Sequence, residues 1–254
     1  MSPQYRLVER YSNVLVPVPE PGDEVCATCW GSTVGYQRCH QCHKHLAMAR
    51  EQLADVVIPI AIAVKGEQLA HELWHYKNSK IERVRIKHTN GLATVFNEFL
   101  GRHENCVATA AGVDGFDLVT TVPSGSRSGV HPLATILNRM IGRTRSRFTD
   151  ALTVARAVAG DRVFSPDRFT LAAPVTGRNV LLVDDTWTTG ASAQSASAAL
   201  KRAGAQRVAV VVIGRHINPQ HVHSAPFLAR ARARPFDWSR CCLGRCLPDN
   251  GSLA

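Results

Sequence analysis

Continuous apolar runs alternate along this chain with segments in which apolar residues recur every three or four positions. Short aliphatic runs are typical of strands buried on both faces of a parallel sheet, and the wider spacing indicates helices that pack by one face. The runs predict strands at Val56–Val64, Asp117–Val122, Val180–Val183 and Arg207–Ile213. Helical spacing occurs at about Leu46–Leu53, Leu69–Tyr76, Leu92–Leu100, His131–Ile141 and Ala191–Ala203. The alternation predicts an α/β domain with a mostly parallel sheet flanked by helices.

The two ends of the chain depart from this pattern. The first fifty residues combine prolines, four cysteines and three histidines with little apolar periodicity. This composition is typical of a module whose apolar core is too small to stabilise it without cross-links such as a bound metal ion. From about Ser224 the chain is rich in Arg and Pro, and it ends near a cysteine cluster. The sequence therefore predicts a small module at 1–50, a main domain at 51–223 and an Arg- and Cys-rich tail at 224–254.

The composition and net charge indicate which class of protein this is and which kind of partner it binds. The 254 residues are 45% hydrophobic and carry a formal net charge of +10, so the chain is globular and suits a partner rich in phosphate, either nucleic acid or a small ligand. Basic clusters at Lys77–His88, Arg139–Arg147 and Arg230–Arg240 are spread out rather than gathered into one nucleic-acid tail. No secretion signal or membrane-length apolar run is found, so we expect a cytoplasmic protein without a membrane span.

The segment Val180–Ser192, VLLVDDTWTTGAS, joins a predicted strand to a predicted helix. Asp184 and Asp185 end the strand, at the edge where open α/β sheets bind ligands. The turn and the start of the helix offer hydroxyls, a flexible glycine and free N–H groups that attract an anion. The residues that would surround this anion are Thr186, Thr188, Thr189, Gly190, Ala191 and Ser192. A ribose 5-phosphate ligand requires hydrogen-bond acceptors for its hydroxyls and an anion-binding turn for its phosphate, and this segment offers both.

Other structures also place an acidic pair after an apolar run. The plain alternative is a core strand that ends in a solvated acidic turn. A Walker B strand requires a Gly-x-x-x-x-Gly-Lys-Ser/Thr loop, which this sequence lacks. A phosphate-receiver domain has its acidic pair near the domain start, whereas Asp184 lies in the last third of the chain. The strand–turn–helix context favours the phosphoribosyl interpretation.

A second loop rich in Gly and Ser follows the strand predicted at Asp117–Val122. It comprises Ser124, Gly125, Ser126, Arg127, Ser128 and Gly129. The glycines let amide N–H groups converge on an anion, and the guanidinium of Arg127 suits phosphate oxygens; the plain alternative is a surface turn. Residues 142–165 between the two loops are basic and weakly periodic, which is typical of a lid or of a solvated helix.

The cysteines indicate metal chemistry. Two Cys-x-x-Cys pairs predict a structural, tetrahedral Zn²⁺ site with no open position for catalysis, whereas a redox function would expect one such pair. The ligands are Cys26, Cys29, Cys39 and Cys42, with His40, His43 and His45 as alternatives. Near the end of the chain, Cys241, Cys242 and Cys246 suit either a second metal with His221 or His223, or ordinary thiols. Cys106 suits a core position.

The acidic pair followed by Thr-Thr-Gly-x-Ser resembles the phosphoribosyl pyrophosphate (PRPP) signature of the type I phosphoribosyltransferases. The resemblance implies their fold, with Asp184 and Asp185 on the ribose hydroxyls aided by Mg²⁺. It also implies that residues 188–192 wrap the 5-phosphate and that the loop with Arg127 holds the pyrophosphate.

A four-cysteine module fused to such a domain is similar to the ComF family, named for bacterial DNA-uptake competence. The likeness runs from about Cys26 to Gly214, and Tyr76-Lys77, Val122-Pro123 and residues 177–180 also fit. One departure concerns the acceptor pocket, because the family's Arg-Gly-Phe-Asn-Gln is replaced by Ser-Gly-Val-His-Pro at 128–132.

These features predict a phosphoribosyltransferase that moves ribose 5-phosphate from PRPP to a nitrogen acceptor and releases pyrophosphate. Its catalytic residues would be Asp184, Asp185 and Arg127, with catalytic Mg²⁺ and structural Zn²⁺. The alternative is a non-catalytic PRPP sensor or a DNA-binding accessory whose partners are DNA or DNA-uptake proteins. The sequence does not identify the acceptor, and it is compatible with a homodimer.

Overall fold

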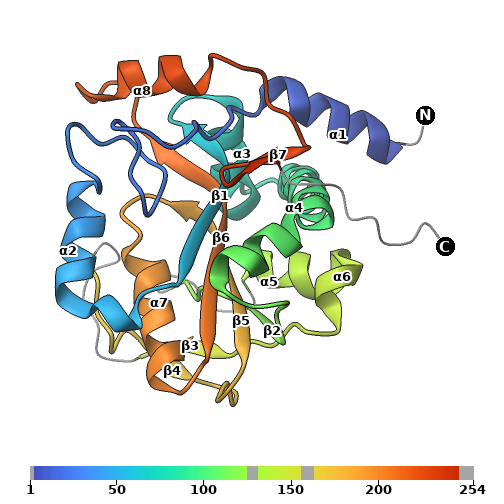
Figure 1. Ribbon diagram of the computed structural model, residues 1–254. Helices are drawn as coiled ribbons and strands as arrows, with labels where there is room; N and C mark the ends of the chain where they lie inside the picture. Colours follow the sequence, from blue (N-terminus) through green and yellow to red (C-terminus); the bar gives the residue numbers. More distant parts are fainter. Residues whose placement is uncertain (1–2, 125–130, 156–162, 246–254) are drawn as a thin grey trace.

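The structure is a computed structural model that describes residues 3–124, 131–155 and 163–245. Its centre is a four-stranded parallel sheet (Figure 1), in the order β1 (Val56–Val64), β6 (Arg207–Ile217), β5 (Asn179–Trp187) and β2 (Leu118–Thr121). The predicted α/β class and parallel sheet are thus confirmed. Two further sheets have two short antiparallel strands each, one formed by β3 (Leu152–Val154) and β4 (Phe169–Leu171) and the other by β7 (Arg240–Cys241) and β8 (Gly244–Arg245).

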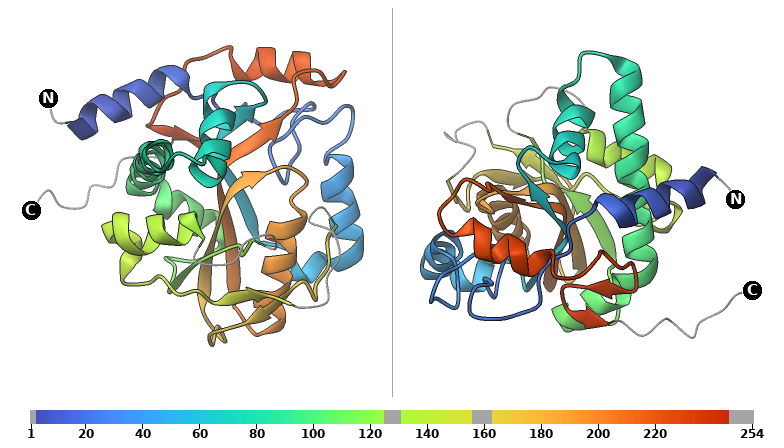
Figure 2. Two further views of the ribbon diagram at one scale, coloured as in Figure 1. Left: turned by 180° about the vertical axis from the view of Figure 1, so that it is seen from behind. Right: turned by 90° about the horizontal axis from the view of Figure 1, so that it is seen from above.

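Helices cover both faces of the sheet (Figure 2). One face carries α3 (Gln68–Asn78) and the long α4 (Glu82–Ala111), and α1 (Pro3–Val14) packs against α4. The other face carries α7 (Ala191–Arg202). The remaining helices are α2 (His40–Ala49) with a 3₁₀ turn at Arg50–Gln52, α5 (Pro132–Thr135), α6 (Gly142–Arg145) and α8 (Ser224–Ala231).

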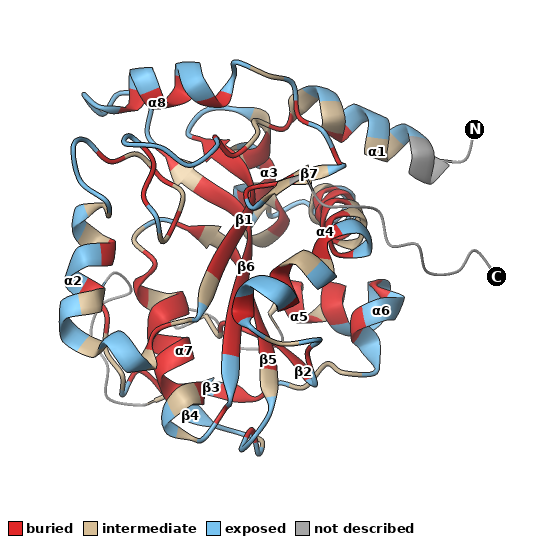
Figure 3. Ribbon diagram, in the orientation of Figure 1, coloured by how far each residue is buried: buried red, intermediate tan, exposed pale blue. Residues whose placement is uncertain are grey.

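The strand β5 shows why the central runs are continuously apolar. Leu181 and Val183 belong to the cluster beneath α4, whereas Val180 and Leu182 belong to the cluster beneath α7. A strand covered on both faces needs apolar residues at successive positions. The burial colouring follows this arrangement, with buried central strands and outer helix faces exposed to solvent (Figure 3).

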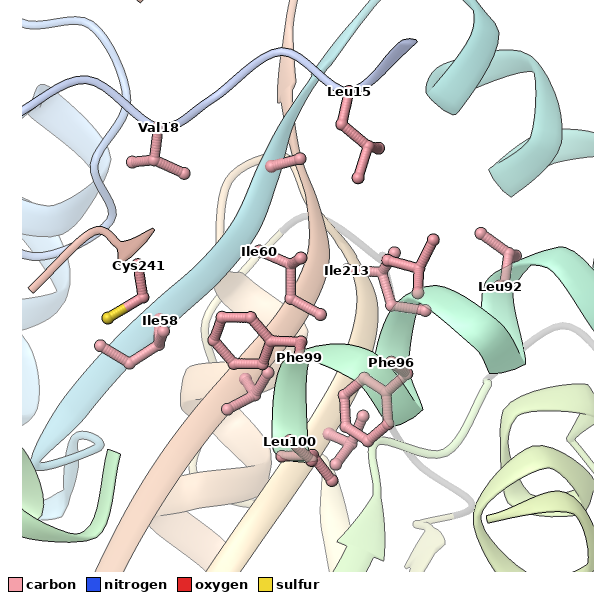
Figure 4. Packing of buried hydrophobic residues seen from close by; sticks show 14 of the residues in the cluster. Leu15, Val18, Ile58, Ile60, Leu92, Phe96, Phe99, Leu100, Ile213 and Cys241 are labelled. Carbon is pink, nitrogen blue, oxygen red and sulfur yellow. The ribbon is translucent and has the colours of Figure 1, made fainter. Parts of the chain in front are cut away.

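The main core lies between the sheet and α4. Phe96, Phe99 and Leu100 of α4 pack against Ile60 of β1 and Ile213 of β6 (Figure 4). Both ends of the chain contribute side chains to this cluster, which also contains Tyr11, Leu15, Phe227, Phe236 and Trp238. The division at 50 and 223 stays a prediction, but both end segments are anchored in the core of the sheet domain.

Several element boundaries differ from the sequence expectations. The helix predicted at His131–Ile141 is α5 followed by a π-helical turn at Ile136–Met140. In the basic connection, residues 152–154 form β3 and pair with β4, so the alternative of a solvated helix does not hold at these residues. Residues 156–162 of this connection lie outside the described part of the chain. None of the described helices combines the length and apolar character needed to cross a bilayer.

Candidate active site and four-cysteine centre

A cavity of about 620 Å³ lies at the carboxyl ends of the four parallel strands. Five predicted ligand-binding residues line it, namely Ser124 after β2, Asp184, Asp185 and Thr186 of β5, and Ser192 of α7. The topology therefore brings three separate segments to one edge of the sheet, where open α/β sheets bind ligands. The opposite wall is formed by α3, and His131, Arg168 and His216 complete the polar lining.

Asp185 is almost completely buried, with 2% of its surface exposed. Adjacent residues of a strand point to opposite faces, and Asp185 points toward α3. There its carboxylate accepts a hydrogen bond from the Tyr76 hydroxyl and pairs with the Lys77 ammonium. Burial disfavours the ionised form, but the charge and hydrogen bond of Lys77 outweigh burial and lower the pKa of Asp185. Asp185 is therefore ionised at neutral pH.

Asp184 lies in a different electrostatic environment. Its Oδ1 accepts the backbone N–H of Asp185 at 2.8 Å. Burial, and then the charge of Asp185, raise the pKa of Asp184 to about 7. The adjacent carboxyls thus have pKa values pushed in opposite directions, a pattern that is common at functional sites. Two neighbouring carboxylates also provide the hard oxygen ligands that Mg²⁺ prefers, so the residues fit that ion.

The predicted phosphate turn connects β5 to α7. Gly190 has a left-handed φ of +80°, and a Cβ there would lie 2.1 Å from the Trp187 ring, so this position requires glycine. Thr189 Oγ1 accepts the N–H of Ala191 at 3.3 Å. Within the described residues, Thr188, Thr189, Gly190 and Ala191 shape the turn but do not line the cavity, whereas Ser192 does.

The second predicted loop is only partly described. Gly125, Ser126, Arg127, Ser128 and Gly129 lie outside the described residues, so their roles stay predictions. A guanidinium is nevertheless supplied to the cavity wall by Arg168, which the sequence did not single out.

Arginines of the predicted lid are engaged elsewhere. Arg147 contacts Glu104 Oε1 at 2.6 Å and the Phe116 carbonyl at 3.0 Å. Arg145 donates to the Arg139 carbonyl at 2.6 Å.

The helix α3 supplies cavity-lining side chains that no local sequence motif identifies. Trp74 and His75 line the cavity beside Lys77, and the His71 and His75 rings lie 3.9 Å apart. The letters HELWH also match the H-E-x-x-H pattern of metalloproteases. Glu72, however, is buried, accepts a hydrogen bond from the Tyr11 hydroxyl and is not among the residues that line the cavity. The carboxylate that such chemistry would need as a base therefore does not lie in the cavity.

The four predicted zinc ligands form one cluster. The sulfur atoms of Cys26, Cys29, Cys39 and Cys42 all lie within 4.8 Å of one another. The Cys29–Cys39 sulfur distance is 3.8 Å, which matches the edge of about 3.8 Å expected for a tetrahedron with Zn–S bonds of about 2.3 Å. The Cys39 N–H points at Cys26 Sγ at 3.3 Å, as a supporting hydrogen bond. The donor set fits Zn²⁺ without a histidine.

The alternative histidine ligands lie elsewhere. His40 and His43 are exposed, and the buried His45 packs its ring against Phe164 at 5.4 Å. The cysteines alone form the cluster of ligand atoms.

Arg215 connects this cluster to the phosphate turn. Its Nη1 donates to the carbonyls of Trp187 and Thr188 at 3.1 Å each. Burial disfavours the charge of Arg215, but the charge and hydrogen bond of Cys29 raise the pKa of the guanidinium. A Cβ on Gly31 would lie 2.3 Å from Arg215 Nη2, so a glycine makes room for this side chain. One buried cation thus contacts both predicted sites, a link that no local motif predicts.

Comparison with known proteins adds distant structural likenesses. No protein-family profile and no curated protein matches the chain. Among solved structures, an allosteric regulatory enzyme of purine biosynthesis matches 46% of this chain at 23% identity and a TM-score of 0.27. The matched region spans only 25% of that enzyme's own length.

Two phosphoribosyltransferases give similar matches. A hypoxanthine phosphoribosyltransferase from Staphylococcus aureus matches 48% of this chain and 73% of its own length, at 14% identity and a TM-score of 0.32. A purine phosphoribosyltransferase from Pyrococcus horikoshii matches 52% of this chain and 88% of its own length, at 14% identity and a TM-score of 0.30. At TM-scores this low, any function must be inferred from the geometry of the site itself.

Proposed function

We propose that this chain is a phosphoribosyltransferase of the type I kind, which binds PRPP in the cavity at the carboxyl ends of the strands. One juxtaposition supports the proposal most. Asp184 and Asp185 of β5 line the same cavity as Ser192, in the first turn of α7, and Ser124, at the start of the second loop. Acceptors for ribose hydroxyls and donors for phosphate thus share one compartment.

The reaction develops positive charge on the sugar ring and negative charge on the departing diphosphate, and the cavity contains groups that stabilise each. The bond from ribose carbon 1 to the diphosphate breaks, and its electron pair leaves with the diphosphate. A nitrogen lone pair forms the new bond on the opposite face, and that nitrogen then releases a proton. The carboxylates of Asp184 and Asp185 stabilise the positive charge that develops on the sugar ring. The departing diphosphate would be held by Arg127, and Arg168 lines the described wall of the same cavity.

Mg²⁺, held by Asp184 and Asp185 with the ligand's own oxygens, would supply positive charge beside the diphosphate when bound. Ser192 and the N-terminus of α7 would bind the 5-phosphate. Gly190 and Arg215 would hold the turn in the shape that this contact needs.

A binding-only role is favoured by one observation. Lys77 and Tyr76 already occupy the Asp185 carboxylate, and a ligand would have to share or displace them. Transfer would use the Asp185 carboxylate to stabilise the charged sugar ring, whereas a PRPP sensor needs no such group. If the protein is instead a DNA-binding accessory of DNA uptake, the cavity wall that contains Lys65, Lys77 and Arg168 would bind a nucleic acid in place of PRPP.

The test is a pyrophosphate-release screen with PRPP, Mg²⁺ and a panel of nitrogen acceptors. The transferase predicts release with at least one acceptor. The release should disappear in an Asp184→Asn, Asp185→Asn double variant and persist in Asp167→Asn, whose carboxylate is exposed and outside the cavity. PRPP binding without release under any acceptor supports the sensor. DNA binding with a steep salt dependence and no PRPP binding supports the accessory role.

A further inference from the structure

A third group of ligand-type side chains connects the C-terminal segment to α4. His103 and Cys106 lie one helical turn apart on α4, and Cys241 belongs to β7. One nitrogen of the His103 ring and the sulfur atoms of Cys106 and Cys241 all lie within 4.8 Å of one another. Cys241 is buried beside Ile58 in the main apolar cluster (Figure 4). Three ligand atoms, from two buried residues and one partly buried residue, therefore converge away from the four-cysteine centre.

His103 has the hydrogen-bonding pattern of a metal ligand. The residue is 1% exposed, and its Nε2 lies 2.8 Å from the Trp238 carbonyl oxygen. A carbonyl can only accept, so Nε2 carries the proton and Nδ1 presents a lone pair. Nδ1 is buried and has no hydrogen-bond partner among the described residues, an arrangement that costs stability unless a ligand is bound. Histidines that bind metals commonly donate their other N–H to a backbone carbonyl in this way.

The donor set selects the kind of ion. One imidazole nitrogen and two cysteine sulfurs suit a borderline-soft cation such as Zn²⁺ rather than Mg²⁺ or Ca²⁺. We propose that the reduced chain binds a Zn²⁺ ion through His103, Cys106 and Cys241, in addition to the four-cysteine centre. This site would fasten residues 238–241 to α4. The proposal does not depend on the proposed transferase function.

The site requires reduction before it binds metal, because Cys106 is disulfide-bonded. A dithiol reductant gives two electrons and two protons to that disulfide, which becomes two thiols while the reductant becomes a disulfide. Zn²⁺ then displaces one proton from Cys106 and one from Cys241, and both protons go to solvent. His103 binds through Nδ1 without losing a proton. Water or another donor completes four-coordination.

Zinc content of the full-length, reduced protein tests the proposal. We expect two zinc ions per chain in the wild type, measured by mass spectrometry of the metal. Cys106→Ser and Cys241→Ser should each lower the content by one ion. The matched control is Cys242→Ser, which changes the adjacent cysteine, also buried and outside the ligand group, and should leave zinc content unchanged. Unchanged zinc content in both Cys106→Ser and Cys241→Ser would overturn the proposal.

A second measurement uses the wild-type protein, so it tests the proposal even if the cysteine variants fail to fold. Reduced wild-type protein is titrated with Co²⁺, whose absorption bands distinguish a site with four thiolates from one with two thiolates and an imidazole. We expect the mixed nitrogen–sulfur spectrum to be present, and to be lost when the Cys106 disulfide is re-formed. A titration that shows only the four-thiolate spectrum would contradict the proposal.

Discussion

The cavity at the carboxyl ends of the strands and the four-cysteine centre both contain charged or metal-binding groups. These groups lie far apart in the sequence in the cavity and close together in the four-cysteine centre. All four sulfur ligands lie between residues 26 and 42, in two Cys-x-x-Cys pairs. In the cleft, the hydroxyl that binds Asp185 comes from Tyr76, 109 residues away. Local spacing can therefore predict all members of a cluster of possible metal ligands, while it predicts only some of the residues that line the cavity. The others depend on the sheet topology that brings α3 over the end of β5.

The two regions are not independent, because Arg215 contacts both. Its guanidinium is buried between the thiolate cluster and the carbonyls of the phosphate turn. Four thiolates around Zn²⁺ carry a net charge of about −2, and a buried cation next to them offsets part of it. Changing one region should therefore alter the other in a measurable way.

The largest expected effect comes from breaking the four-cysteine centre. Structural zinc contributes on the order of 10 kcal/mol of binding free energy in isolated modules. Cys29→Ser should lose this zinc ion and open residues 22–50 to proteolysis, which metal analysis and limited digestion can measure. His43→Ala, which changes an exposed histidine next to Cys42, should keep the zinc. Full zinc retention in Cys29→Ser would show that the four-cysteine cluster does not bind this zinc ion.

Removing the connecting cation should have the next largest effect. Arg215→Met leaves the thiolate cluster and two turn carbonyls without their buried donor, and breaking a buried pair costs about 3–5 kcal/mol. We expect a loss of stability of this size in chemical denaturation. We also expect about tenfold weaker PRPP binding (about 1.4 kcal/mol), because the turn loses its support. Arg207→Met is the control, since that half-exposed arginine on the same strand pairs with Asp55 at the surface and should cost less than about 1 kcal/mol. Equal effects of the two substitutions would show that Arg215 has no special role.

Glycine substitutions separate backbone strain from crowding in the turn. Gly190 and Gly177 have similar left-handed φ values of +80° and +73°, but only Gly190 has a neighbouring ring where a Cβ would lie. Gly177→Ala should cost about 1 kcal/mol from backbone conformation alone. Gly190→Ala should cost about 1–3 kcal/mol more from overpacking and should weaken PRPP binding. Denaturation curves that coincide for the two variants would contradict the close approach of Trp187.

The smallest expected effect is a pH dependence within the cleft. Because the pKa of Asp184 is raised to about 7, this carboxyl is largely neutral at pH 6 and largely ionised at pH 8. Binding that uses its ionised form should strengthen about tenfold over this interval, as expected for one titrating group. Asp184→Asn should remove that part of the pH dependence and leave only the titration of PRPP itself. Identical pH profiles for wild type and variant would show that Asp184 does not contact the ligand complex.

Much of the fold follows from the sequence because its signals are local. Val180–Val183 and Val56–Val64 predict buried strands, and both lie in the parallel sheet. Asp184 and Asp185 were predicted to end the strand, but β5 continues to Trp187. Arg168, Trp74 and Arg215 escaped prediction because only tertiary packing brings them to the site. The same is true of His103, whose partner Cys241 lies 138 positions later in the chain.

Calorimetric titration of PRPP with Mg²⁺ into the full-length protein tests the central claim most directly. We predict saturable binding to the wild type and to Asp167→Asn, and a loss of affinity of at least a hundredfold in the Asp184→Asn, Asp185→Asn double variant. Circular dichroism would first establish that the double variant is folded. Undiminished affinity in that folded variant would contradict the assignment of the cavity at the end of β5 as the PRPP site.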